Sequence, residues 1–149
     1  MPDLLAKSGY PVVKASQVTV PPQYPDIYEM RYNIAMHMNS VMQTDIEIGK
    51  ILSRLERDGL TDKTIIFVFA DHGSDLPRSK EFCYSEGLHI PLIISVPESI
   101  EGIESGTVRD DLVSLIDVTV TDLALTNQNI HESKDTRNVF DKNNKREYL

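Results

Sequence analysis

The chain has 149 residues, 40% of them hydrophobic, which is enough for one domain with a sizeable core. Its 15 basic and 23 acidic residues give a net charge of −8, which argues against nucleic acid or an anionic membrane surface as the main partner. A small basic pocket for an anion is still compatible with that charge. The single cysteine, Cys83, excludes an internal disulfide framework.

The sequence contains no apolar run close to the roughly 18 residues that a membrane-spanning helix needs. We therefore expect no membrane span. Residues 1–3 do not open a signal peptide, so if the protein is exported we expect its targeting segment to lie outside this chain.

Residues 1–25 are expected to form an irregular lead-in, because prolines interrupt any regular pattern there. These prolines include Pro11, Pro21, Pro22 and Pro25. Residues 18–20 make at best a short edge strand. Since such a segment cannot form a core of its own, we expect it to lie across a larger unit.

A long helix is predicted from Asp26 onward, with Asp26 as the N-cap and Glu29 completing a capping-box-like pair. Gly59 fits its end. The apolar positions follow helical spacing and are Ile34, Met38, Val41, Ile48, Leu52 and Leu55. Asp45 interrupts this stripe, and we favour a structural hydrogen bond over a catalytic role for its carboxylate.

The next predicted element is a strand over residues 65–70 that leads directly into Asp71, His72 and Gly73. A polar loop follows over residues 74–80, and a second apolar strand lies within residues 87–97. In open α/β sheets the carboxyl end of a strand is where ligands bind. The order helix, strand, loop, strand predicts an α/β fold with part of a largely parallel sheet flanked by helices, and the sheet is expected to be incomplete.

The last third of the chain is predicted to contain one more helix. Residues 112–117 form a strand or loop that leads into this helix, which continues to Leu125. Beyond Thr126 the composition turns polar, and we expect an extended or poorly ordered tail.

The polar groups after the first strand suit two kinds of ligand. Asp71 and His72 could hold a divalent cation, and the cations Arg78 and Lys80 could bind an oxyanion such as sulfate or phosphate. The alternative is an ordinary strand-end turn, in which Asp71 caps backbone amides and His72 is exposed. Arg78 and Lys80 would then be solvated surface residues. The pattern alone leaves both interpretations open.

Residues 64–73 and 77–80, with Tyr84, Gly87 and residues 91–94, resemble the carboxyl-terminal half of a sulfatase catalytic domain in the alkaline-phosphatase-like superfamily. Upstream and downstream positions agree with the same pattern, most closely in the branch similar to heparan N-sulfatase. These positions are residues 20–22, Pro25, Asp26, Arg31, Asp45, Ile48, Gly49, Leu52, Leu55, Gly59, Leu60, residues 113–117 and Thr121. The resemblance divides the chain into a lead-in (1–25), the C-terminal half of the catalytic α/β domain (26–126) and a polar tail (127–149).

The resemblance implies a role for five residues. Asp71 and His72 would be metal ligands, usually of calcium, while an imidazole ligand also suits zinc or manganese. Lys80 would be catalytic and would contact the sulfate and the leaving-group oxygens. Arg78 would replace it if the loop register differs, and His89, where an arginine is frequent, would form a wall of the substrate pocket.

Sulfatases act through a formylglycine made from a Cys/Ser-x-Pro-x-Arg motif, which this chain lacks. Cys83 is followed by Tyr84, Ser85 and Glu86, so it has neither the proline nor the arginine. We therefore expect a fragment of a sulfatase, inactive alone, whose parent hydrolyses sulfate esters or sulfamates on a small molecule or glycan.

Two other interpretations stay open. One is a zinc-dependent phosphodiesterase or phosphomutase relative, and the other is a non-catalytic domain that binds an anion or a partner. The resemblance implies a periplasmic, secreted or lysosomal protein. An incomplete sheet also predicts self-association through exposed strand edges and apolar surface.

Overall fold

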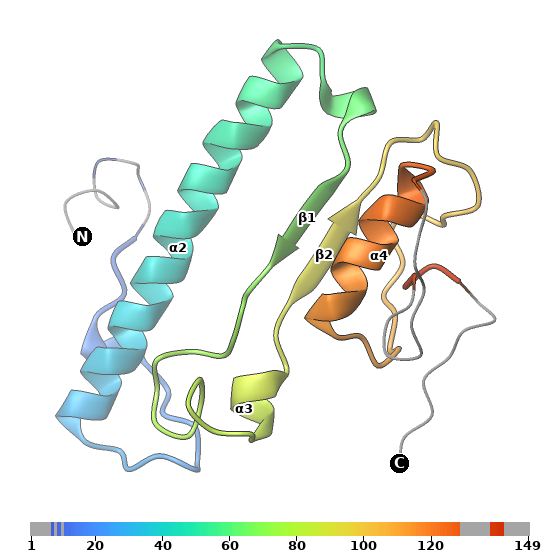
Figure 1. Ribbon diagram of the computed structural model, residues 1–149. Helices are drawn as coiled ribbons and strands as arrows, with labels where there is room; N and C mark the ends of the chain where they lie inside the picture. The colour runs from blue at the N-terminus through green and yellow to red at the C-terminus, as the bar shows by residue number, and fades with distance from the viewer. Residues whose placement is uncertain (1–6, 8, 10, 129–137, 142–149) are drawn as a thin grey trace.

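The computed structural model describes residues 7, 9, 11–128 and 138–141 (Figure 1). Much of the predicted tail and the start of the lead-in therefore lie outside the described residues. In chain order the elements are η1 (Ala15–Gln17), α2 (Tyr28–Arg57), η2 (Thr61–Lys63), β1 (Ile66–Phe69), α3 (Ser85–Leu88), β2 (Leu92–Ser95) and α4 (Leu115–Leu125). Within the described residues, no helix is both long and apolar enough to cross a membrane.

Helix α2 is the long helix that the apolar spacing predicts, but it begins differently. Its N-cap is Ile27, and the Asp26 carboxylate accepts two hydrogen bonds from the Arg31 guanidinium, at 2.5 and 2.6 Å. This pairing lowers the pKa of Asp26, mainly through the hydrogen bond. Asp26 therefore stabilises the start of the helix through a side chain one turn ahead instead of through backbone amides.

The end of α2 at Gly59 agrees with the prediction. Gly59 has a φ of 67°, the left-handed conformation that glycine adopts without steric cost. The N–H of Gly59 donates to Glu56 O at 3.0 Å, and the N–H of Leu60 donates to Leu55 O at 3.0 Å. These two bonds form a Schellman motif, which satisfies carbonyl groups that the helix end would otherwise leave without a donor.

The small core lies between the lead-in and the N-terminal half of α2. Its buried residues are Val18, Tyr24, Met30, Ile34 and Ala35, and the partly buried Val13, Val20 and Leu76 pack against them. Backbone groups of the lead-in also form hydrogen bonds with α2 side chains. The Arg31 Nη1 group, for example, donates to Val18 O at 2.6 Å. The lead-in thus packs across α2, and Leu76 attaches the loop after β1 to the same core.

Strands β1 and β2 form a small two-stranded sheet that corrects the expected parallel arrangement. They pair antiparallel, from Ile66 opposite Ser95 to Phe69 opposite Leu92. The reason is the path of the connection, which returns on itself at one end of the sheet and contains only the one-turn helix α3 (Figure 1). Parallel pairing would require a crossover to the opposite end of the strands.

The two-stranded sheet is separated from α2. No Cα atom of α2 lies within 8 Å of a Cα atom of either strand in the described part of the chain. None of the strand residues is buried. The core under α2 therefore positions the loop after β1, and the strands themselves contribute little to it.

Helix α4 forms where the sequence predicts a second helix. At its start the Ser114 N–H donates to the Asp117 Oδ2 atom at 2.8 Å, and Asp117 is fully buried. Further along, the Thr121 hydroxyl accepts a hydrogen bond from the Val139 N–H at 3.0 Å. Asp117 and Thr121 therefore have structural roles, as a cap and as an anchor for residues 138–141.

Candidate functional site

The predicted metal ligands Asp71 and His72 lie side by side just after β1. The Asp71 Oδ2 atom is 3.5 Å from the His72 Nε2 atom, and their side chains are 81% and 48% exposed. Two donor atoms at this separation can both reach one cation at about 2–2.4 Å. The structure thus places the two donors together, on an exposed edge of the described chain.

The other nitrogen of His72 fixes its orientation. The His72 Nδ1 atom lies 2.8 Å from the carbonyl oxygen of Gly73. A carbonyl can only accept, so this hydrogen bond requires a proton on Nδ1 and, in a neutral ring, leaves the lone pair on Nε2. Such a backbone partner is typical of histidines that bind metals through the opposite nitrogen.

The predicted sulfate-contacting residue, Lys80, lies in the loop between β1 and α3 and forms an ion pair. Its Nζ atom is 2.5 Å from the Asp75 Oδ1 atom. The hydrogen bond with Asp75 is the main cause that raises the pKa of Lys80, and the charges of Glu81 and Asp71 raise it further. Reciprocally, this bond lowers the pKa of Asp75. Lys80 therefore stays charged.

Arg78 and His89, the other two predicted substrate-binding residues, lie on the same connection. Arg78 has a φ of 67°, an uncommon conformation for a residue with a side chain, and its guanidinium carbon lies 4.5 Å from the centre of the Tyr84 ring. His89 is exposed at the C-cap of α3, where its N–H donates to Ser85 O at 2.8 Å. The structure thus places Asp71 beside His72, pairs Lys80 with Asp75 in the loop that follows, and holds Arg78 against an aromatic ring.

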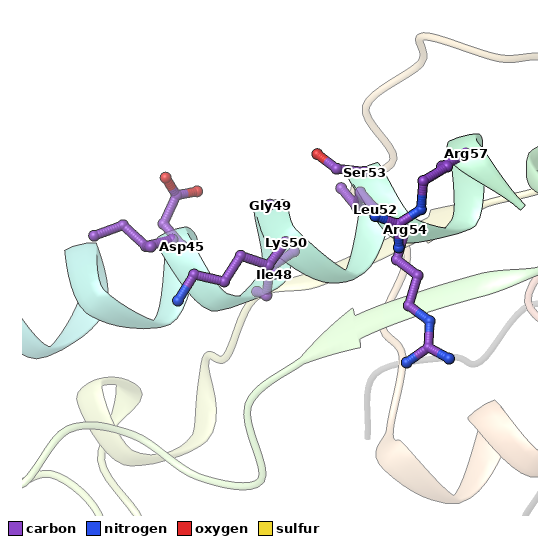
Figure 2. A pocket seen from close by; sticks show the side chains of 9 residues that line it. Asp45, Ile48, Gly49, Lys50, Leu52, Ser53, Arg54 and Arg57 are labelled. Atoms are coloured by element: carbon purple, nitrogen blue, oxygen red, sulfur yellow. The ribbon is translucent and has the colours of Figure 1, made fainter. Parts of the chain in front are cut away.

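Away from these residues, a hollow lies along the C-terminal half of α2 and is lined by residues of that helix alone, from Asp45 to Arg57. Figure 2 shows that Asp45 and Ser53 point to one side of the helix, whereas Lys50 and Arg54 point to the other. Polar groups that diverge in this way do not converge on one ligand. Asp45 is exposed here, away from the buried environment that its place in the apolar stripe predicts.

Comparison with known proteins decides the family. A family model described as Sulfatase matches residues 12–128. The chain belongs to the sulfatase family. An ulvan-active sulfatase of Formosa agariphila is 34% identical over 112 residues, which are 75% of this chain and 18% of that protein.

Two further sulfatases are similar over shorter regions. Human arylsulfatase K is 32% identical over 88 residues, 55% of this chain and 16% of that protein. An N-acetylglucosamine-6-O-sulfatase of Bacteroides thetaiotaomicron is 36% identical over 69 residues, 44% of this chain and 12% of that protein. No solved structure matches the chain. The chain thus spans less than one fifth of each of these sulfatases, and its predicted place within the domain and its closeness to heparan N-sulfatases stay predictions.

The sulfatase fold implies a divalent cation, and the residues present fit part of such a site. Asp71 and His72 offer one carboxylate and one oriented imidazole. Within the described residues, no group of three or more histidine, cysteine, aspartate or glutamate side chains could hold a metal ion. Calcium takes about six to eight oxygen ligands. The described residues therefore offer two adjacent donors, fewer than a calcium ion takes.

One charged residue of this site was not predicted from the sequence. Asp75 is the partner of Lys80, although it lies in a polar loop where solvated residues are common. The pattern that could have indicated it is a single acidic residue in a short loop that carries two cations. Cys83, which lacks the motif for formylglycine, is exposed in the same connection.

Proposed function

We propose that this chain is part of a sulfatase that hydrolyses sulfate esters or sulfamates, with a sulfated sugar or a small sulfated molecule as substrate. The observation that carries the proposal is the adjacent pair Asp71 and His72 after β1, followed by the charged Lys80 of the next loop, in a chain of the sulfatase family. The relative named as an N-acetylglucosamine-6-O-sulfatase supports a sugar as the group that carries the sulfate.

In this proposal each residue has a defined role. The Lys80 ammonium has three N–H donors, of which Asp75 uses one, so the others can bind sulfate oxygens. Asp71 and His72 contribute ligands to a divalent cation, with calcium as the proposed ion and zinc or manganese as alternatives. When bound, the cation supplies positive charge that stabilises negative charge on the transferring group. Arg78 and His89 line the substrate side.

The nucleophile is proposed to lie outside this chain, because Cys83 and its neighbours lack the proline and arginine of the formylglycine motif. We therefore propose that the isolated chain is inactive. The whole protein is proposed to work in a periplasmic, secreted or lysosomal compartment, as sulfatases of this kind commonly do.

The proposal can be tested with the isotopically labelled 149-residue chain and inorganic sulfate. We expect sulfate to shift the NMR signals of Lys80 and its neighbours, and we expect Lys80→Met to abolish the shifts because the charged donor is lost. Lys63→Met, which removes an exposed lysine of η2, is the matched control and should leave the shifts unchanged. Equal effects of the two variants would contradict the role of Lys80.

Two further results would each contradict part of the proposal. Preferential binding of inorganic phosphate, together with zinc at His72, would favour the phosphoryl-transfer relative. Hydrolysis of an aryl sulfate by the isolated chain would show that the nucleophile lies within it.

A further inference from the structure

The loop between β1 and α3 is closed on itself by two glycines. The Gly73 N–H donates to Gly87 O at 3.1 Å, although the two residues are separated by the whole loop. A Cβ atom added at Gly73 would lie 1.9 Å from Glu86 O and 2.8 Å from the Gly87 Cα atom. The two backbones therefore touch, and neither glycine has room for a side chain.

Ser79 lies at the centre of this closed loop. It is 1% exposed, which makes it one of the few fully buried side chains in the described part of the chain. Its hydroxyl donates to Glu86 O at 2.8 Å and accepts a hydrogen bond from the Ser74 hydroxyl at 3.2 Å. A Cβ atom at Gly73 would come within 2.6 Å of this same hydroxyl oxygen.

The backbone of Ser79 extends the same network. Its N–H donates to Leu76 O at 3.2 Å, and its carbonyl accepts from the Phe82 N–H at 2.9 Å. The next residue, Lys80, donates its N–H to Ser74 O at 3.2 Å. Since Leu76 packs against the core under α2, Ser79 joins a fixed part of the molecule to the residue that follows it.

Ser79 therefore connects two parts of the candidate site. On one side it is the immediate neighbour of Lys80, and on the other it touches Gly73, which follows His72. We infer that Ser79 is a positioning residue that fixes the placement of Lys80 relative to Asp71 and His72, an inference that rests on the proposed function of those residues. Ser79 touches no reacting group itself, and it acts through the backbone that it holds.

The test is amide hydrogen exchange on the labelled chain and on Ser79→Ala. This change removes the buried hydroxyl without adding an atom, so the backbone carbonyl of Glu86 loses its donor. We expect the amides of Gly73 and Lys80 to exchange roughly tenfold faster, the change that corresponds to about one lost hydrogen bond. Amides in the N-terminal half of α2 should keep their rates. Ser53→Ala, at an exposed position of α2, is the matched control and should change neither set.

A second readout separates positioning from a general loss of stability. If Ser79 positions Lys80, Ser79→Ala should also reduce the shifts that inorganic sulfate induces at Lys80. It should also bring the pKa of Asp75 back toward its ordinary value, because the ion pair is no longer held. His72 and His37 also lower the pKa of Asp75, but both are present in the unsubstituted chain and in the variant.

Gly87→Ala gives an independent test of the same network. Its new Cβ atom would lie 2.4 Å from Ser79 O and 2.3 Å from Phe82 O, so the backbone must move. We expect the same amides to lose protection, whereas Gly49→Ala, where nothing lies within 4 Å, should leave them unchanged. If Gly87→Ala unfolds the chain, Ser79→Ala alone decides.

Each outcome decides for or against the inference. Unchanged exchange at Gly73 and Lys80 in Ser79→Ala would overturn it, as would equal acceleration of every amide. The inference also fails if these two amides are unprotected in the unsubstituted chain. If sulfate leaves Lys80 unperturbed in the unsubstituted chain, the proposed function fails at this residue, and the exchange data still decide whether Ser79 holds the loop.

Discussion

At the scale of single residues, Asn39 shows how the lead-in is held on α2. Its side chain is 4% exposed and makes two bonds to Val13, accepting from the backbone N–H at 2.9 Å and donating to the carbonyl at 3.0 Å. This pairing copies the way one strand pairs with another. It satisfies the backbone of a segment that has no strand or helix of its own at this point.

Asn39→Ala should therefore destabilise the chain, because the N–H and the carbonyl of Val13 both lose their partner. We expect the free energy of unfolding to fall by about 2 kcal/mol, measured by urea denaturation followed by circular dichroism. Asn33→Ala, at an exposed position of the same helix, is the matched control, and it should change stability by less than about 0.5 kcal/mol. Similar losses for the two variants would contradict the role of Asn39.

Some residues of the candidate site could be predicted from the sequence, and others could not. Asp71, His72 and Lys80 could be identified because their residue types follow a predicted strand, although their roles stay predictions. Asp75 could not, because an exposed aspartate in a polar loop has no local feature that distinguishes it. Only the folding of the loop brings its carboxylate to Lys80. Buried Ser79 was missed for the same reason.

At the scale of elements, one glycine inside α2 and one just after its end have opposite effects on the stability of the helix. Gly49 lies inside the helix with nothing within 4 Å of an added Cβ atom, whereas Gly59 ends the helix with a φ of 67°. Gly49→Ala should raise the free energy of unfolding by about 0.5–1 kcal/mol, because alanine loses less backbone entropy on folding. Gly59→Ala should lower it by about 1 kcal/mol, because a Cβ atom is disfavoured in the left-handed conformation.

Thermal or urea denaturation of the two variants, each compared with the unsubstituted chain, checks both signs at once. The pair provides its own control, since the same chemical change is made twice on one helix. A loss of stability in both variants would indicate that Gly49 is covered in solution. A gain in both would show that the Schellman motif does not form.

The elements that could be predicted are those set by local periodicity. Helices α2 and α4 follow from their apolar spacing and from local signals at their ends, such as Gly59. The direction of β2 could not be predicted, because it depends on the path of the connection between β1 and β2. That path is set by contact between Gly73 and Gly87, which are distant in sequence. The one-turn helix α3 depends on the same closed loop and has no periodic pattern.

At the scale of the whole molecule, the sheet is apolar on both faces and poorly covered. Pairing places Phe67, Phe69, Leu92 and Ile94 on one face, and Ile66, Val68 and Ile93 on the other. None of these side chains is fully buried in the described structure, and Ile93 is 62% exposed. A continuous apolar run of this kind is typical of a strand covered on both sides. The described residues cover neither face completely.

We therefore expect the chain to associate with itself in solution, which buries part of this surface. Ile93→Lys places a charge on the exposed face of β2 and should weaken this self-association. The average molecular mass in solution at a given concentration should then fall, as measured by sedimentation or light scattering. Val108→Lys is the matched control, because Val108 is 93% exposed but lies between β2 and α4, away from the sheet. Equal effects of the two lysines would point to net charge as the cause. A chain that stays monomeric at every concentration would show that the sheet faces are covered by some other part of the same molecule.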